Sequence, residues 1–149
     1  MNERVLWLDN DKAYLMPFVE ELQDQGFSVT VVETALEAET CLDAETYDYV
    51  IVDVMVPTKT EAEETIYTRE ETKRGYNTGV VFWRRVGKKL LAQGIGVLIF
   101  TQRLDQSIRD ELTNAGVPTQ NFARKFQLSD PAAFVERLKN LRNAAMRVS

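Results

Sequence analysis

The chain has 149 residues, of which 44% are hydrophobic and 28% charged, and its formal net charge is -5. This size and composition predict a single globular domain and exclude a disordered or fibrous chain. The negative charge argues against direct binding to nucleic acid, because nucleic-acid binders usually carry a basic contact face. The sequence contains no histidine, which excludes imidazole bases, histidine-activated nucleophiles and nearly all zinc sites. Carboxylate, lysine, hydroxyl and hard-cation chemistry remain.

The N-terminal residues MNERVLWLDND carry acids where a secretory signal would have a long apolar stretch. No apolar run approaches the roughly 20 residues that are needed to cross a bilayer. We therefore expect a cytoplasmic protein that does not contact the membrane. The single Cys41 rules out an internal disulfide and is compatible with a reducing compartment.

Short apolar runs alternate along the chain with segments of helical spacing. The predicted strands comprise residues 5–8, 27–32, 49–54, 96–100 and 119–123. The predicted helices comprise residues 17–25, 35–44, 80–92, 105–115 and a last helix from 131 nearly to the C-terminus. Five strands alternating with five helices predict one three-layer α/β domain over residues 1–149, with a doubly wound five-stranded parallel sheet.

Residues 58–79 form a polar and mainly charged stretch between the third strand and the next apolar helix. Connections in such folds usually have about 2 to 6 residues, so this stretch is interpreted as an inserted loop. We expect a solvated loop with a helical turn near residues 62–67. The alternative is a lid or docking segment that governs access to Asp53 at the end of the preceding strand.

Polar residues follow the apolar strands, where the carboxyl ends of a parallel sheet usually form the ligand site. They are Asp9, Asn10 and Asp11 after the first strand, Asp53 after the third, Thr101 after the fourth and Lys125 after the fifth. Asp53 ends an otherwise apolar strand, so its carboxylate needs a nearby cation or lysine. Two carboxylates and a backbone carbonyl make an incomplete cage for Mg²⁺, while lysine and threonine side chains can bind phosphate oxygens.

The sequence resembles the receiver domains of response regulators in two-component signalling, which have a flavodoxin-like fold. The matching strings are VLWLDND, YDYVIVDVMVP, VLIFTQ and FARKF, and the likeness covers nearly the whole chain except the insertion after Pro57. The resemblance implies that Asp53 accepts a phosphoryl group from a phosphohistidine of a partner histidine kinase or phosphotransfer protein. It also implies that Asp9, Asn10, Asp53 and the Met55 carbonyl bind Mg²⁺, and that Lys125 and Thr101 assist the transfer.

The same resemblance implies a signalling switch rather than an enzyme with turnover. The Thr101 hydroxyl would turn toward the phosphoryl group, and the aromatic ring of Phe122 would move inward. The new dianion would thereby bias a two-state equilibrium and change a surface that binds a downstream protein.

Three positions depart from the family pattern. Asn10 replaces the second of two adjacent acids, Gln102 replaces a small residue after the switch threonine, and Phe126 replaces a proline after the lysine. Asn10 lowers the negative charge of the metal site, and Gln102 stands where the phosphoryl donor approaches. These changes leave open a pseudo-receiver that binds partners without being phosphorylated.

The string VLWLDND also fits the haloacid dehalogenase-like phosphatases, whose first strand ends in Asp-x-Asp. In that reading Asp9 is the nucleophile and Asp11 the general acid and base. The sequence lacks the acidic pair that this family needs after Lys125, and the reading gives no role to Asp53. A plain protein-binding module, whose polar strand ends only cap helices and form turns, is a third possibility.

Overall fold

The computed structural model describes residues 2–148 of the chain and the side chains of residues 2–141. Five strands form one parallel sheet in the order β2-β1-β3-β4-β5. The strands are β1 (Arg4–Leu8), β2 (Ser28–Val32), β3 (Tyr49–Val52), β4 (Gly96–Thr101) and β5 (Phe122–Arg124). The parallel five-stranded architecture predicted from the sequence is confirmed.

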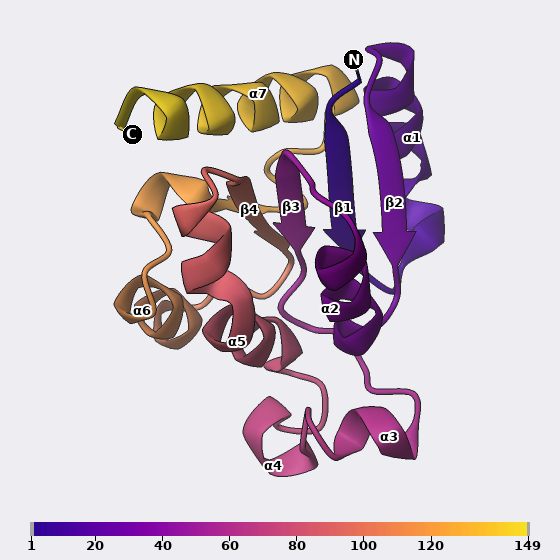
Figure 1. The fold of residues 1–149 in the computed structure, drawn as a ribbon, viewed down its shortest axis with the longest axis vertical. Helices are drawn as coiled ribbons and strands as arrows, with labels where there is room; N and C mark the ends of the chain where they lie inside the picture. Colours follow the sequence, from indigo (N-terminus) through magenta and orange to yellow (C-terminus); the bar gives the residue numbers. More distant parts are fainter. Residues whose placement is uncertain (1, 149) are drawn as a thin grey trace.

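Five longer helices cover the two faces of the sheet (Figure 1). They are α1 (Lys12–Asp24) and α7 (Pro131–Val148) on one face, and α2 (Ala35–Ala44), α5 (Thr78–Ala92) and α6 (Gln106–Asn114) on the other. Helices bury both faces of the sheet, which explains why the strand sequences are continuous apolar runs. Within residues 2–148, no helix combines the length and the apolar character that crossing a membrane requires.

Alternation along β1 shows how the strands divide the core into two halves. Val5 and Trp7 pack toward α1 and α7, whereas Leu6 and Leu8 pack toward α2, α5 and α6. Successive side chains of a strand point to opposite faces, so each strand contributes to both halves. The indole ring of Trp7 stacks on Phe134 of α7 at a centroid distance of 5.1 Å.

The first helix begins five residues earlier than the sequence predicted. The Asp11 side chain accepts a hydrogen bond from the Tyr14 amide at 3.2 Å and caps a helix that starts at Lys12. Pro17 therefore lies inside α1 rather than in its first turn. The last predicted strand is also displaced, because a short 3₁₀ helix, Thr119–Asn121, precedes β5.

The inserted segment, residues 58–79, differs from the expected solvated loop. It contains two short helices, α3 (Glu61–Glu64) and α4 (Arg69–Thr72), which lie beyond the end of the sheet to which the strands point (Figure 1). Tyr67 and Thr72 are buried. The segment is therefore packed against the domain.

A polar anchor explains this packing. The Tyr67 hydroxyl donates to Glu39 of α2, and the Arg85 side chain of α5 donates to the same carboxylate at 2.8 and 3.1 Å. The Arg85 guanidinium also lies 5.5 Å from the centre of the Tyr67 ring. One tyrosine thus joins the inserted segment to two helices of the main fold.

Candidate functional site

The site lies where β1 and β3 end side by side. The chain leaves β1 toward one face of the sheet and leaves β3 toward the other, which opens a crevice at the carboxyl ends of the two strands. The Asp9 amide donates to the Val32 carbonyl, and the Asp53 amide donates to the Leu8 carbonyl, each at 3.0 Å. The hydrogen bonding of the sheet therefore extends into both acids and fixes their position.

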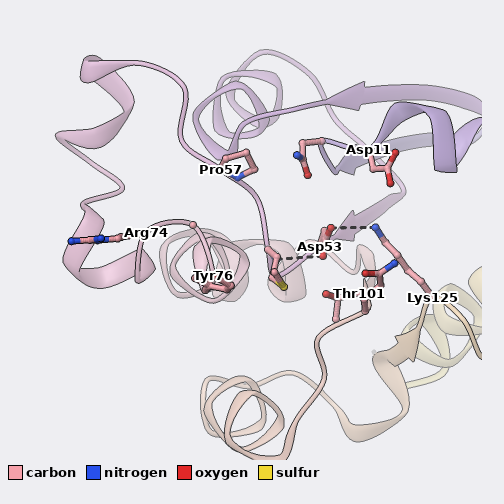
Figure 2. Close-up of a pocket in the computed structure, with 11 residues that line it drawn as sticks. Asp11, Asp53, Pro57, Arg74, Tyr76, Thr101 and Lys125 are labelled. Carbon is pink, nitrogen blue, oxygen red and sulfur yellow. Dashed lines mark hydrogen bonds and ion pairs between the residues drawn. The ribbon is translucent and has the colours of Figure 1, made fainter.

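Lys125 joins these two acids. Its backbone amide donates to the Thr101 carbonyl at 3.1 Å, which places the residue directly after β5. Its Nζ lies 3.2 Å from Asp53 Oδ2 (Figure 2). The same Nζ lies 2.7 Å from Asp9 Oδ2. Asp9 is 0% exposed, Lys125 4% and Asp53 6%. One buried ammonium therefore faces two buried carboxylates.

The environment of this acidic cluster shifts the pKa of two of its groups. The pKa of Asp9 is raised from 3.8 to about 6, mainly by burial and then by the charge of Asp53, while contact with Lys125 acts in the opposite direction. Burial alone would lower the pKa of Lys125, but the charges of Asp53 and Asp9 outweigh burial, so the pKa is raised. The lysine therefore stays charged, and Asp9 takes up a proton near pH 6.

The oxygens of Asp9 differ in how well they are satisfied. Oδ1 accepts a hydrogen bond from the Asp11 amide at 2.9 Å. Oδ2 is buried and meets Lys125 as a close ion pair without a well-aligned hydrogen bond. The cluster thus keeps spare acceptor capacity and an excess negative charge.

A pocket of about 600 Å³ opens over Asp53. Its walls are formed by Asn10, Asp11, Asp53, Met55, Pro57, Arg74, Gly75, Tyr76, Thr101, Gln102 and Lys125 (Figure 2). Five of the predicted site residues therefore share one pocket, namely Asn10, Asp53, Met55, Thr101 and Lys125. The sixth, Asp9, is not among the lining residues and lies behind Lys125. Asp53 is thus the carboxylate of the ion-paired cluster that faces the pocket.

Two further predicted residues have clear positions in the structure. Phe122 begins β5, packs with the α2, α5 and α6 half of the core, and does not line the pocket. The Arg109 guanidinium lies 5.5 Å from its ring centre. Asp11 lines the pocket, but its carboxylate caps α1 as the N-terminal turn of that helix requires. The structure thus separates Phe122 from the acids, and its role in a switch stays a prediction.

The sequence analysis did not identify the residues that close the other side of the site. The Gly79 amide donates to the Val54 carbonyl at 2.9 Å, and a Cβ on Gly79 would lie 2.4 Å from the Asp53 carbonyl oxygen. Only glycine lets the first turn of α5 come so close to the acceptor strand. The string GYNTG, with glycine at both ends, was the signal in the sequence that could have indicated this approach.

Arg103 connects the loop after β4 with the inserted segment. Its guanidinium donates to the Tyr76 carbonyl at 2.9 Å and to the Asn77 side chain, and it lies 5.9 Å from the centre of the Tyr76 ring. The backbone amide of Arg103 donates to the Thr101 hydroxyl at 3.3 Å. The predicted switch threonine and the wall of the pocket are therefore linked through one residue.

Comparison with known proteins identifies the fold. No protein-family model matches the chain, and no curated protein sequence matches it. Among solved structures, a CheY-like response-regulator receiver domain from Methanospirillum hungatei JF-1 superposes with a TM-score of 0.76 and 18% identity over 100% of both chains. A putative response regulator from Chloroflexus aurantiacus J-10-fl gives 0.70 and 20% identity over 96% of this chain and 99% of the other.

A third structure, the chemotaxis response regulator CheY4 of Vibrio cholerae, matches with a TM-score of 0.70 and 18% identity over 95% of this chain and 99% of the other. This chain has the receiver-domain fold. The fold predicted from the sequence resemblance is confirmed. At these identities the comparisons establish the fold alone.

The oxygens at the strand ends of this receiver fold match the donors that Mg²⁺ prefers. They are the carboxylates of Asp9 and Asp53, the side-chain amide of Asn10 and the Met55 carbonyl. Among the described residues, no three Asp, Glu, Cys or His side chains are grouped to hold a metal ion. The buried Asp9 Oδ2 without an aligned hydrogen bond nevertheless leaves an acceptor for a cation. The donor set therefore fits a hard divalent ion that also keeps ligands from outside the chain.

Two of the three departures from the receiver pattern, Asn10 and Gln102, line the pocket. Gln102 is exposed there, and its effect on a phosphoryl donor stays a prediction. Phe126 follows Lys125 and is 63% exposed. None of the peptide bonds in the described part of the chain is cis.

Proposed function

We propose that this protein is a response regulator in which Asp53 accepts a phosphoryl group from a histidine kinase or phosphotransfer protein. The observation that carries the proposal is that Asp53 is the carboxylate of the cluster that lines the pocket, next to Lys125 and Thr101. Asp9 is fully buried behind Lys125, which disfavours a phosphatase that uses Asp9 as the nucleophile. The receiver fold supports the same choice.

The proposed reaction moves the phosphoryl group from nitrogen to oxygen. A carboxylate oxygen of Asp53 attacks the phosphorus of a phosphohistidine in the partner, the P–N bond breaks, and its electron pair stays on the partner's imidazole. Lys125 Nζ, 3.2 Å from Asp53 Oδ2, is placed to neutralise the charge on the transferred group. The Thr101 hydroxyl, which faces the same pocket, is placed to donate to a phosphoryl oxygen.

In this proposal Asp9, Asn10, Asp53 and the Met55 carbonyl would hold Mg²⁺, which would supply positive charge to the oxygens of the phosphoryl group. Lys125 pairs with both acids and would offset part of the negative charge that they and the incoming phosphate concentrate at one point.

The acyl phosphate would then be detected through Thr101. In the present structure the Thr101 hydroxyl accepts from the Arg103 amide, and turning toward a phosphoryl group would weaken that bond. The loop between β4 and α6 would respond, and the Phe122 ring, which is already buried in this structure, would change its packing rather than move in from solvent, which changes the surface near α6 and β5. We place the site for an unidentified downstream protein on that surface. The protein would act in the cytoplasm as a switch rather than as an enzyme, without contacting membranes or nucleic acid directly.

The pseudo-receiver remains as a second candidate because Lys125 already ion-pairs with both acids and Asn10 adds no charge. In that case the fold would present a binding surface without phosphorylation. The two candidates differ in one observable, the formation of an acyl phosphate at Asp53.

The test is a phosphate-affinity gel after incubation with acetyl phosphate, with Mg²⁺ or with a chelator. Native protein should give a retarded band in Mg²⁺, and Asp53→Asn or chelation should abolish it. A native protein without a retarded band would support the pseudo-receiver. Turnover of a generic phosphate ester that is lost in Asp9→Asn and retained in Asp53→Asn would support the phosphatase.

A further inference from the structure

The pocket over Asp53 is larger than a phosphoryl group requires. Its volume of about 600 Å³ lies within the range of about 300 to 1,000 Å³ that is typical of sites for whole small molecules. The chemistry at its base, formed by Asp53, Thr101 and Lys125, occupies only one end. The other end is formed by the inserted segment through Arg74, Gly75 and Tyr76. Something larger than the phosphoryl group therefore fits over the acceptor.

Tyr76 offers an aromatic surface at that end. Its side chain is 57% exposed although it lines the pocket, so its ring is available to a bound molecule. Figure 2 shows Tyr76 on the side of the pocket toward the inserted segment, with Asp53 and Lys125 farther along the same opening, whereas Arg74 extends away from Asp53. Of the two side chains, Tyr76 is the one in position to meet a group that approaches Asp53.

The backbone before Tyr76 is held in an uncommon conformation. Lys73, Arg74 and Gly75 have φ values of 50°, 58° and 94°, so three successive residues lie in the left-handed region. For residues other than glycine this conformation is unfavourable, because Cβ then approaches the backbone carbonyl. The Val56 amide donates to the Gly75 carbonyl at 3.1 Å, and the Gly75 amide donates to the Thr72 hydroxyl at 3.3 Å. The first bond joins the turn to the segment that follows Asp53, and the second closes the turn on itself.

Arg103 fixes Tyr76 from the opposite side. It binds the Tyr76 carbonyl and lies 5.9 Å from the ring centre, a cation–π distance that orients the ring. The ring is thus exposed, while the backbone that carries it is held by Val56 after β3 and by Arg103 in the loop after β4. A solvent-facing aromatic ring on such a backbone is suited to stacking with a flat ligand.

From this geometry we infer that Tyr76 stacks on the imidazole ring of the phosphoryl donor and makes the site selective for imidazole-bearing donors. The inference rests on the proposed function, because it assigns a role to Tyr76 in the same transfer to Asp53. The flat aromatic leaving group is the part of a phosphohistidine that extends beyond the phosphorus. Tyr76 holds this ring while the carboxylate at the base of the pocket attacks.

The phosphoryl transfer to Asp53 needs only the donor and the carboxylate. One Asp53 carboxylate oxygen forms a bond to phosphorus as the P–N bond breaks. The electron pair of that bond stays on the imidazole nitrogen. The donor reacts with its second ring nitrogen protonated, so the ring leaves as neutral imidazole. Tyr76 takes no part in bond making and acts only by positioning the ring.

The test compares two small donors, phosphoimidazole and phosphoramidate. Both transfer a phosphoryl group by cleavage of a P–N bond, but only phosphoimidazole carries a ring. The rate constant for phosphorylation of Asp53 in Mg²⁺ is measured for each donor, and their ratio is the readout. Tyr76→Ala should lower the phosphoimidazole-to-phosphoramidate ratio by about 3- to 10-fold, as expected for the loss of one aromatic pair. Tyr76→Phe keeps the ring and should keep the ratio within about 2-fold of that of native protein.

Phe126 provides a matched control. It is also an exposed aromatic residue with an arginine over its ring, Arg124 at 6.0 Å, but it does not line the pocket. Phe126→Ala should therefore leave the ratio of the two rate constants unchanged. Circular dichroism of each variant shows that the fold is retained.

An unchanged ratio in Tyr76→Ala would overturn the inference while leaving the proposed function intact, because both donors would still phosphorylate Asp53. An equal fall in Tyr76→Phe and Tyr76→Ala would also overturn it, since the hydroxyl rather than the ring would then matter. Failure of both donors with native protein would overturn the proposed function, and the role of Tyr76 with it.

Discussion

The acidic cluster and the inserted segment meet at the same pocket but are stabilised in opposite ways. The cluster concentrates two buried carboxylates around the single ammonium of Lys125, so it carries excess negative charge at a cost in stability. The inserted segment places its charges mostly in solvent and is held by anchors such as the hydrogen bond from Tyr67 to Glu39 of α2. The domain thus tolerates electrostatic repulsion between the buried carboxylates at the acceptor. The pocket wall is held in place by other contacts, outside the acidic cluster.

Removing Lys125 should produce the largest effect, because it leaves two buried carboxylates facing each other. We expect Lys125→Met to lower the free energy of unfolding by about 3 to 5 kcal/mol at pH 7.5, measured by urea denaturation. Lys88→Met, a change of an exposed lysine on α5, should stay within about 0.5 kcal/mol of native protein. Equal stabilities of the two variants would contradict the description of the cluster.

Replacing Asp9 should have the opposite sign, and its size should depend on pH. The pKa of Asp9 is raised in the folded state from 3.8 to about 6, so its stabilising protonation is fully present below pH 4 and is lost as the pH rises through 6. In a chelator, Asp9→Asn should therefore be more stable than native protein above pH 6, by at most about 3 kcal/mol. The difference should vanish near pH 4. A gain that is the same at both pH values would show that the charge of Asp9 is not its cause.

Gly79 tests the contact between the two regions. A Cβ at this position would lie 2.4 Å from the Asp53 carbonyl, so Gly79→Ala should destabilise the protein by about 1 to 3 kcal/mol and also slow phosphorylation of Asp53. Gly87→Ala is the matched control, because its Cβ would contact Trp83 at 2.4 Å, on the same helix but away from the acceptor. It should destabilise the protein without changing the phosphorylation rate. Equal phosphorylation rates in Gly79→Ala and Gly87→Ala would show that the start of α5 does not affect the acceptor site.

The smallest effect is expected at the anchor of the inserted segment. Tyr67→Phe removes the hydrogen bond to Glu39 but leaves the ion pair between Glu39 and Arg85, so we expect a loss of about 1 kcal/mol. Hydrogen exchange over residues 58–79 should accelerate more than exchange in the sheet. Tyr47→Phe, which removes a longer bond of 3.3 Å to Glu45, should cost less and leave residues 58–79 unchanged. Unaltered hydrogen exchange in Tyr67→Phe would show that the bond from Tyr67 to Glu39 does not hold residues 58–79 in place.

The strand ends could be predicted from the sequence because each polar residue directly follows an apolar run. Asp53 and Lys125 are 72 positions apart, but both follow strands of one parallel sheet, and that topology alone brings them together. The start of α1 was wrong because Pro17 was read as a helix start, whereas the Asp11 cap stabilises an earlier turn. Both Asp11 and Pro17 are residue types that favour a helix start, and in the structure the helix starts after Asp11.

The order within residues 58–79 could not be predicted in the same way. Tyr67 finds Glu39, 28 positions earlier, and Arg85 finds the same carboxylate from 46 positions away, with no periodic pattern to announce either contact. A charged composition is typical of solvated loops, and the buried tyrosine within it is a single residue. Tyr76 in the pocket wall is likewise contacted by Arg103 from 27 positions away, so no local sequence pattern indicates its position.

Asp53 is the residue that we propose to be phosphorylated, and chemical trapping can locate the modified aspartate. Borohydride reduction of protein treated with acetyl phosphate and Mg²⁺ converts an aspartyl phosphate to homoserine, which peptide mass spectrometry locates in the chain. Native protein should contain homoserine at position 53, and Asp53→Asn should contain homoserine at no position. Homoserine at position 9, or unmodified aspartate at both positions, would contradict the proposal.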